Sequence, residues 1–324
     1  MTADRPAAES GTHVLVRRWL DSGRLDVPFP GSGATAQRWH RLMDLAEEDL
    51  GAGRLAEAHT DAAAILHELG EKPPNPHELW GVWAAESSTF RLVAKALSDN
   101  VFLLEGTKPW CSGASLCTHA LVTAEIEGGQ RALFAVALDA PTVTALPSAW
   151  SNVGLASTDT RAVQFSATRA LHVGAAGRYL ERAGFWHGAI GVAACWLGGA
   201  HAVARPLYRY AVERAEDPHL LAHLGAVDAT LAGADAMLSV AAAHVDADPL
   251  DRTDTARLLA RRTRAVIEHA VEEVVTRTGR AVGPEPLCHD NLHAQRVADL
   301  VIYVRQSHAE RDLADLGRLC RPRR

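Results

Sequence analysis

The nine residues Gly106–Ala114 place the tightest constraint on how this chain can fold. They read Gly-Thr-Lys-Pro-Trp-Cys-Ser-Gly-Ala and lie between two apolar runs of strand character, Val101–Leu104 and Ala120–Ala124. Long helical patterns lie on both sides of this strand-rich region. Two glycines, a proline and a tryptophan in nine residues indicate a backbone shaped to approach a flat partner. A turn that only reverses the chain rarely contains a tryptophan.

The bulk composition is that of a globular protein with a large core, and it argues against a nucleic-acid-binding protein and a membrane protein. Of the 324 residues, 48% are hydrophobic and the net charge is -6, so we expect no nucleic acid partner. The segment Phe185–Ala204 has no Asp, Glu, Lys or Arg and is just long enough to span a membrane. It is, however, largely Gly and Ala and carries His187 and His201. We therefore expect a buried helix of a water-soluble bundle and no membrane contact.

The five cysteines do not suggest a disulfide framework or a zinc site. Their number is odd and no CxxC spacing occurs, and a secretory signal is not recognisable. We expect reduced thiols, a cytoplasmic location and no bound metal. His289 and His293 are four residues apart, but they flank an expected helix start and no companion motif accompanies them.

The periodicity of apolar residues predicts helices at both ends of the chain. Near the N-terminus, helical spacing covers Val14–Leu20 and then the longer region Ala36–Leu69, which Gly70 and two prolines end. In the C-terminal half, long helical patterns are joined by short proline-containing loops, which predicts an up-down bundle. We place its four helices at 183–214, 218–245, 252–279 and 290–317.

The middle of the chain has strand character. Its residues predict one hairpin turning at Ser98–Asn100, a second turning at Gly128-Gly129 and a further strand at Thr160–Thr168. The predicted fold class is α+β, mainly α, with three domains. These are an N-terminal helical domain (1–79), a central antiparallel β domain (80–175) and a C-terminal four-helix bundle (176–324).

This order of elements and several short motifs resemble the acyl-CoA dehydrogenase superfamily of flavoproteins. Gly106–Gly113 resembles the family's G-x-K-x-W-I-[ST] strand, and Ser157–Phe165 resembles the strand that closes its β domain. Tyr210–Arg214 matches its Y-x-x-x-R element, and Glu48–Gly70 resembles its early helix pair. Arg296–Asp299 resembles its R-x-x-R-D element, with an alanine in place of the second arginine.

The resemblance implies an FAD cofactor whose N5 atom faces the substrate. Trp110 would then stack near the isoalloxazine ring, and backbone groups at Cys111 and Ser112 would hydrogen-bond its N5–O4 edge. Arg214 would meet the cofactor phosphates, because a guanidinium is planar and permanently charged. Gln306, on the last helix, is a further cofactor-binding candidate.

The sequence departs from the family before the first hairpin. The family usually has T-E-P-G-A-G-S-D there, with the threonine contacting the flavin and later residues helping to bind acyl-CoA. Here the same place reads Trp83-Ala-Ala-Glu-Ser-Ser88. Ala85 occupies a cofactor-binding position but cannot donate a side-chain hydrogen bond.

A second departure concerns the catalytic base, which in the family is commonly a glutamate about two turns after the last-helix aspartate. Here that region reads Arg-Gln-Ser-His308, and the first carboxylate is Glu310. In one branch of the family the base lies at the start of the first bundle helix, where the polar residues are Glu181, Arg182 and His187. The catalytic candidates are therefore His308 and Glu310.

His308 has both a catalytic and a structural interpretation. It follows an apolar helical stripe, so we expect it to face inward. The stripe consists of Ala294, Val297, Val301 and Val304. With a reference pKa near 6.5, a neutral histidine could accept a proton at physiological pH. The alternative is a core histidine whose ring hydrogen-bonds a carbonyl or carboxylate.

Three functions are consistent with these residues. The first is FAD-dependent α,β-dehydrogenation of an acyl thioester or similar small molecule, with an electron-transfer flavoprotein or another electron acceptor. The second is a non-catalytic subunit of a heteromeric complex whose other subunit carries the base. The third is a flavin-dependent monooxygenase or oxidase of the same fold, with His308 assisting. The resemblance also implies a homodimer, homotetramer or hetero-oligomer.

Overall fold

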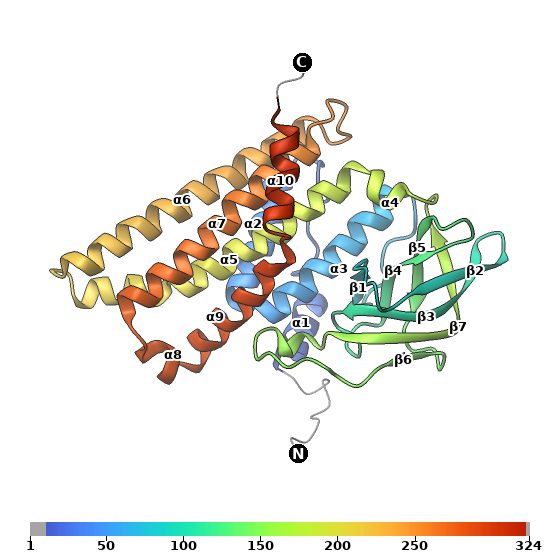
Figure 1. The fold of residues 1–324 in the computed structure, drawn as a ribbon, viewed down its shortest axis with the longest axis horizontal. Coiled ribbons are helices and arrows are strands. Elements are labelled where there is room, and N and C mark those ends of the chain that lie inside the picture. The colour runs from blue at the N-terminus through green and yellow to red at the C-terminus, as the bar shows by residue number, and fades with distance from the viewer. Residues whose placement is uncertain (1–10, 322–324) are drawn as a thin grey trace. The chain divides into compact units, whose positions relative to one another are not determined.

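The computed structural model describes residues 11–321, which form two compact units (Figure 1). Unit 1 comprises the described residues up to Val27 together with Leu55–Asn152 and Ala156–Phe185. Unit 2 comprises Pro28–Arg54, Val153–Leu155 and the described residues from Trp186 onward. Two helices, α3 (Leu50–Glu68) and α5 (Ala183–Glu213), contribute residues to both units.

Unit 1 is built on a sheet whose strand pairs form a closed ring. The pairs β4–β2, β2–β3, β3–β7, β7–β5 and β5–β4 return to their starting strand, while β1 pairs with β4 and β6 pairs with β7. Closing a sheet in this way removes most of its exposed edges. The strands are β1 (Trp80–Trp83), β2 (Leu92–Ser98), β3 (Val101–Cys111), β4 (His119–Glu125), β5 (Arg131–Ala137), β6 (Val143–Ala145) and β7 (Arg161–Val173).

Apolar side chains fill both sides of this sheet. Phe134, Val163 and Phe165 are fully buried inside the ring, next to Cys111. On the outer side, Ile65 and neighbouring residues of α3 pack against Trp80, Leu121 and Leu133. Alternate residues of each strand therefore face two different cores. The remaining helical elements of unit 1 are α1 (Gly11–Asp21), the short helix η2 (Ala156–Thr158) and α4 (Arg178–Glu181).

Unit 2 is a helical bundle with sharply defined helix ends. Asp217 caps α6 by accepting hydrogen bonds from the backbone N–H groups of His219 and Leu220, with Pro218 at the first helical position. Asp290 caps α9 in the same way. Apart from α3 and α5, which contribute to both units, the helices of unit 2 are α2 (Thr35–Glu48), α6 (Pro218–Ala247), α7 (Ala256–Val282), α8 (Glu285–His289), α9 (Asn291–Tyr303), η3 (Val304–Gln306) and α10 (Glu310–Leu319).

The predicted helix at 290–317 is wrong as a single element. The chain leaves the α-helix after Tyr303 and starts again at Glu310. Ser307 explains part of the break, because its Oγ donates to Glu268 at 2.5 Å and accepts the backbone N–H of Ala309 at 3.1 Å. Such side-chain bonds compete with the helical ladder. Ala309 then adopts a left-handed φ of 44°.

The other predicted elements are confirmed, with some extensions. Both hairpins form, and the strand predicted at Thr160–Thr168 continues to Val173. The segment Phe185–Ala204 forms a largely buried part of α5. Strands β1 and β6 were not predicted, since each is at most four residues long.

Helix α6 is the helix that length and hydropathy alone would allow to cross a membrane, among the residues described. This evidence is weak, because core helices of water-soluble proteins pass the same test.

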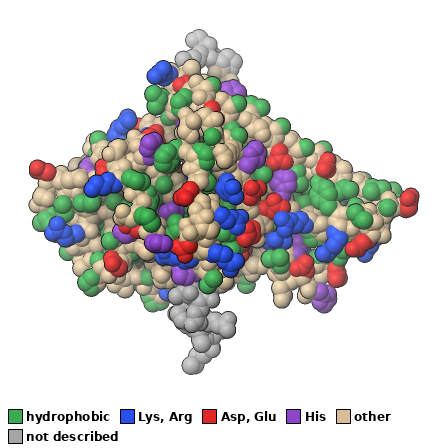
Figure 2. All heavy atoms as spheres, turned by 180° about the vertical axis from the view of Figure 1, so that it is seen from behind, with side chains coloured by type: hydrophobic (Ala, Val, Ile, Leu, Met, Phe, Trp, Pro, Cys, Tyr) green, Lys and Arg blue, Asp and Glu red, His purple; other side chains and the backbone are tan. Residues whose placement is uncertain are grey.

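On the face shown in Figure 2, basic and acidic side chains are interspersed.

Candidate functional site

The end of β3 presents one aromatic ring outward. The pairing of β3 with β7 shifts register between Lys108 and Cys111, which marks a β-bulge. At this bulge Trp110 takes a left-handed φ of 57°, and the residue is 60% exposed. The edge of the Trp150 ring meets it, with ring centroids 6.3 Å apart and planes at 85°. The Trp110 ring is therefore exposed to solvent at a residue with an unusual backbone conformation.

Hydrogen bonds fix the backbone that follows Trp110. The Ser112 carbonyl accepts from Trp83 Nε1 at 3.0 Å, and the Ser112 hydroxyl lies 3.0 Å from the Thr160 hydroxyl. Thr160 continues the chain of hydroxyls to Thr158 at 2.9 Å. The backbone N–H of Gly113 donates to the Thr158 carbonyl at 2.7 Å. We call Trp110, Ser112 and Thr160 the Trp110 platform.

The two glycines of this stretch are explained by contacts within the chain. Gly106 has φ of +119°, and a Cβ there would lie 2.2 Å from the Arg91 carbonyl oxygen. Gly113 has φ of +72°, and a Cβ there would lie 2.6 Å from Cys117 Sγ. Their close approach is therefore to neighbouring segments of unit 1. Of the features that suggested a flat partner, Trp110 is the one left exposed.

Cys111 is a packing residue. Its side chain is fully buried, and burial raises the pKa of its thiol. A protonated, inaccessible thiol is a poor nucleophile. Its predicted contribution to a cofactor site, through its backbone, stays a prediction.

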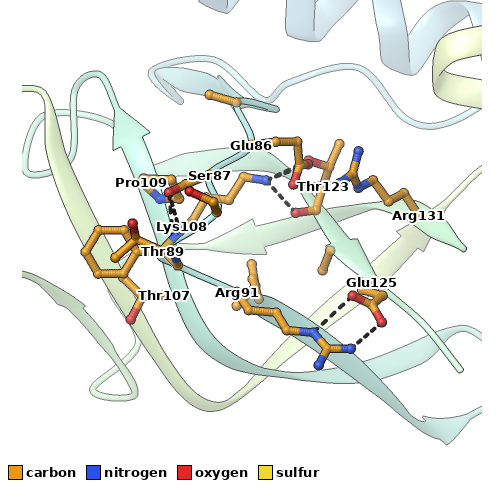
Figure 3. Close-up of a pocket in the computed structure, with 15 residues that line it drawn as sticks. Glu86, Ser87, Thr89, Arg91, Thr107, Lys108, Pro109, Thr123, Glu125 and Arg131 are labelled. Carbon is orange, nitrogen blue, oxygen red and sulfur yellow. Dashed lines mark hydrogen bonds and ion pairs between the residues drawn. The ribbon is translucent and has the colours of Figure 1, made fainter. Parts of the chain in front are cut away.

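Residues of the connection between β1 and β2, Ala85 among them, line a polar cavity of about 240 Å³. Figure 3 shows this cavity. Lys108 forms its inner wall: its side chain is only 3% exposed, and Nζ donates to the Thr123 carbonyl at 2.9 Å and to Thr123 Oγ1 at 2.8 Å. Burial lowers the pKa of Lys108. Glu86 extends from the loop toward the same amine. Ala85 lines this cavity and is exposed.

A second, mainly apolar cavity of about 480 Å³ lies in the same unit. Its apolar wall includes Tyr179, Leu180 and Phe185, which follow β7 in the chain. Glu181, one of the polar residues considered as a base, also lines it. Pockets with an apolar wall and a few polar groups are typical of small-molecule sites.

The predicted residues of the last helical segment do not share an inward face. His308 lies between η3 and α10, with its side chain 59% exposed and its Nδ1 3.6 Å from Asp312 Oδ1. The prediction that His308 continues an inward apolar stripe is wrong, because the α-helix ends at Tyr303. Glu310 and Gln306 are exposed as well. The catalytic roles of His308 and Glu310, and the cofactor role of Gln306, stay predictions.

Arg214 and Gln306 lie far apart in unit 2. Arg264 of α7 donates to the Ala189 carbonyl at 2.7 Å and to the Gln306 carbonyl at 3.5 Å, which places Gln306 near the start of α5. Arg214 follows the far end of α5, with its guanidinium 5.0 Å from the Tyr210 ring centroid. At 1.5 Å per residue, Ala189 and Arg214 are roughly 35 Å apart. One chain cannot use Gln306 and Arg214 on the same group of a cofactor.

Asp299, the aspartate of the last-helix motif, has a structural role in unit 2. It is 5% exposed, and its Oδ1 accepts the Leu155 N–H at 2.6 Å and Gln295 Nε2 at 2.7 Å. Gly154 allows this close approach, since a Cβ there would lie 2.2 Å from the Ala298 carbonyl oxygen. The motif therefore attaches the segment Val153–Leu155 to α9.

The structure adds residues that the sequence did not single out. Trp150 is in contact with Trp110, although forty residues separate them. Glu86, Thr123 and Arg131 line both cavities. A signal existed for Lys108, since the motif Gly-Thr-Lys-Pro-Trp contains it, but its partners lie on β4 (Thr123) and in the connection between β1 and β2 (Glu86).

Comparisons with known proteins identify the fold. No protein-family model and no curated protein matches this sequence. Solved structures do match over nearly the full length. TdsC of Paenibacillus sp. A11-2, in complex with FMN and indole, is 18% identical, with a TM-score of 0.75 and coverage of 96% of this chain and 95% of that chain.

Two further structures show the same likeness. The nitrososynthase of Micromonospora carbonacea var. africana is 16% identical, with 98% of both chains covered and a TM-score of 0.76. The electron transferring flavoprotein of Acidaminococcus fermentans is 15% identical, with 98% of this chain and 93% of that chain covered and a TM-score of 0.82. This chain shares the α+β, acyl-CoA dehydrogenase-like fold of these structures. The predicted fold class is confirmed.

Proposed function

We propose that this protein is a flavin-dependent oxidoreductase. The observation that carries the proposal is the Trp110 platform: an exposed indole at a left-handed backbone position, followed two residues later by Ser112, whose hydroxyl lies 3.0 Å from that of Thr160. Structures of the same fold include a complex of TdsC with FMN and a complex of KijD3 with FMN and a nucleotide sugar. They support a flavin but do not choose between FMN and FAD.

The chemistry of the platform fits a flat, electron-poor ring. The exposed indole offers a surface for stacking, and Ser112, two residues along the chain, carries a hydroxyl that can donate to the polar edge of such a ring. A bound flavin supplies hydride or electron transfer to and from the substrate. Trp110 would position the flavin ring and cover one of its faces, and the Trp150 ring would support Trp110 through their edge contact.

Among reactions of flavins, we favour monooxygenation or oxidation over dehydrogenation of an acyl thioester. Dehydrogenation needs a base to remove the α proton. Of the carboxylates in 291–321, Asp299 is hydrogen-bonded in the interior, and Asp312 and Asp315 are paired with Arg261. The remaining one, Glu310, is exposed, as is Glu181, the carboxylate considered near the start of the first bundle helix. A structure of the dibenzothiophene monooxygenase TdsC has the same fold, which also supports oxygen-dependent chemistry.

An absorbance spectrum and an oxygen electrode test this proposal. Purified protein mixed with FMN or FAD should retain flavin through gel filtration and should consume oxygen when reduced flavin is supplied together with the correct substrate. Bleaching by an acyl thioester without oxygen would favour dehydrogenation instead. Flavin retention without any turnover, reversed by a second subunit, would favour the non-catalytic alternative. A folded protein that retains neither flavin would refute the proposal.

A further inference from the structure

The carboxylate of Glu86 occupies an anion site formed by three other residues. Its Oε1 lies 3.4 Å from Lys108 Nζ and 3.3 Å from Thr123 Oγ1, and its Oε2 lies 3.2 Å from an Arg131 guanidinium nitrogen. Charge-assisted hydrogen bonds are usually about 2.7–2.9 Å long. The Glu86 carboxylate therefore satisfies the site loosely, while Thr123 holds Lys108 at normal distances.

The two sides of this contact differ in burial. The Lys108 side chain is 3% exposed, so its charge is fixed in the wall of the unit. Glu86 is 44% exposed and belongs to the connection between β1 and β2. A buried cation needs an anionic partner, whereas Glu86 can be solvated by water when it leaves. Lys108 therefore stays in place, whereas Glu86 can be replaced by another anion.

Glu86 and two residues of its anion site, Thr123 and Arg131, join the polar cavity to the apolar one, while Lys108 lines the polar cavity alone. Glu86, Thr123 and Arg131 line both spaces, so the anion site lies at the boundary between them. On one side are the polar groups of Figure 3, and on the other is the wall that contains Leu180 and Phe185. A molecule that binds here meets two cations at one end and hydrocarbon at the other.

We infer that these cavities form one binding site for a small amphipathic acid, and that Glu86 is an internal competitor for it. The ligand's carboxylate or phosphate would replace the Glu86 carboxylate at Lys108 and Arg131. Its apolar body would lie against Leu180 and Phe185. This binding site does not depend on a flavin; identifying the acid as the substrate does rest on the proposed function.

Calorimetric titration of the protein without added flavin tests this inference. The probes are hexanoate and hexyl phosphate, which have both parts, and hexan-1-ol and acetate, which have one part each. Glu86→Gln keeps the shape of the competitor and removes its charge, so one of the two acids should bind about tenfold more tightly than to the wild-type protein. Glu127→Gln, which removes the same charge from the β4–β5 turn outside both cavities, should change nothing.

Arg131→Gln provides the opposite test. This side chain is half-exposed, so the variant should fold, and it should bind the preferred acid about tenfold more weakly. Preference for hexanoate or for hexyl phosphate identifies the head group. The inference is overturned if Glu86→Gln binds neither acid more tightly, if Glu127→Gln has the same effect, or if hexan-1-ol binds as well as the acids. Flavin binding is measured in a separate experiment. A failure of the protein to bind flavin would therefore not change the result of these acid titrations.

Discussion

Replacing Asp299 by asparagine should change how the free energy of unfolding depends on pH. The aspartate is 5% exposed and accepts hydrogen bonds from the Leu155 N–H and from Gln295. Burial raises its pKa from 3.8 to about 6, although those hydrogen bonds act in the opposite direction. The ionised form is thus disfavoured in the folded protein.

The sign and size of the effect follow from that pKa. Between pH 3.8 and 6 the folded protein binds more protons at Asp299 than the unfolded chain does. Stability from this group is therefore fully present below pH 3.8 and is lost as the pH rises through 6. A change in pKa of this size corresponds to about 3 kcal/mol, an upper value for the loss.

Urea unfolding of the wild-type protein and of Asp299→Asn at pH 4 and pH 7 measures this loss. The free energy of unfolding of the variant, minus that of the wild-type protein, should increase by up to about 3 kcal/mol from pH 4 to pH 7. His59→Gln is a control of opposite sign: burial lowers the pKa of His59 to about 4, so wild-type stability from it is lost as the pH falls from 6.5. An Asp299→Asn difference that is equal at both pH values would refute the reasoning.

Two further substitutions test the packing of unit 2. Gly154→Ala places a Cβ 2.2 Å from the Ala298 carbonyl oxygen and should reduce stability by about 1–3 kcal/mol in urea unfolding; an unchanged midpoint would contradict that contact. Asp315 is 8% exposed and pairs with Arg257 and Arg261, so Asp315→Asn should speed amide hydrogen exchange across Glu310–Leu319. Glu310→Gln, a neutralisation at an exposed position of the same helix, should leave that exchange unchanged; equal exchange in both variants would argue against the ion pairs.

Local patterns predicted most of the fold. Hairpins at Ser98–Asn100 and Gly128-Gly129 depend on turn residues close in sequence, and helix α5 depends on a long run of small and apolar residues. The break before α10 was missed because it depends on Ser307, which bonds Glu268 on another helix. An apolar stripe alone does not show where a distant side chain ends a helix.

The candidate site was predictable only in part. Trp110 and Ser112 were recognisable from their motif, and in the structure Trp110 is exposed at the bulge that ends β3, where its φ is left-handed. Trp150 and Glu86 were not recognisable, because their contacts join segments far apart in sequence. Lys108 looked like part of a strand, and its burial depends on Thr123 of β4.

Flavin binding to the Trp110→Ala variant is the most direct test of the proposed function. Titration of FMN and of FAD, followed by flavin fluorescence, should give saturable binding to the wild-type protein. Loss of the stacking surface should weaken that binding about tenfold or more. Leu171→Ala, which truncates an exposed apolar side chain elsewhere on the same sheet, should bind as the wild-type protein does. Absence of binding of either flavin to folded wild-type protein, or equal binding by the Trp110→Ala variant, would contradict the account.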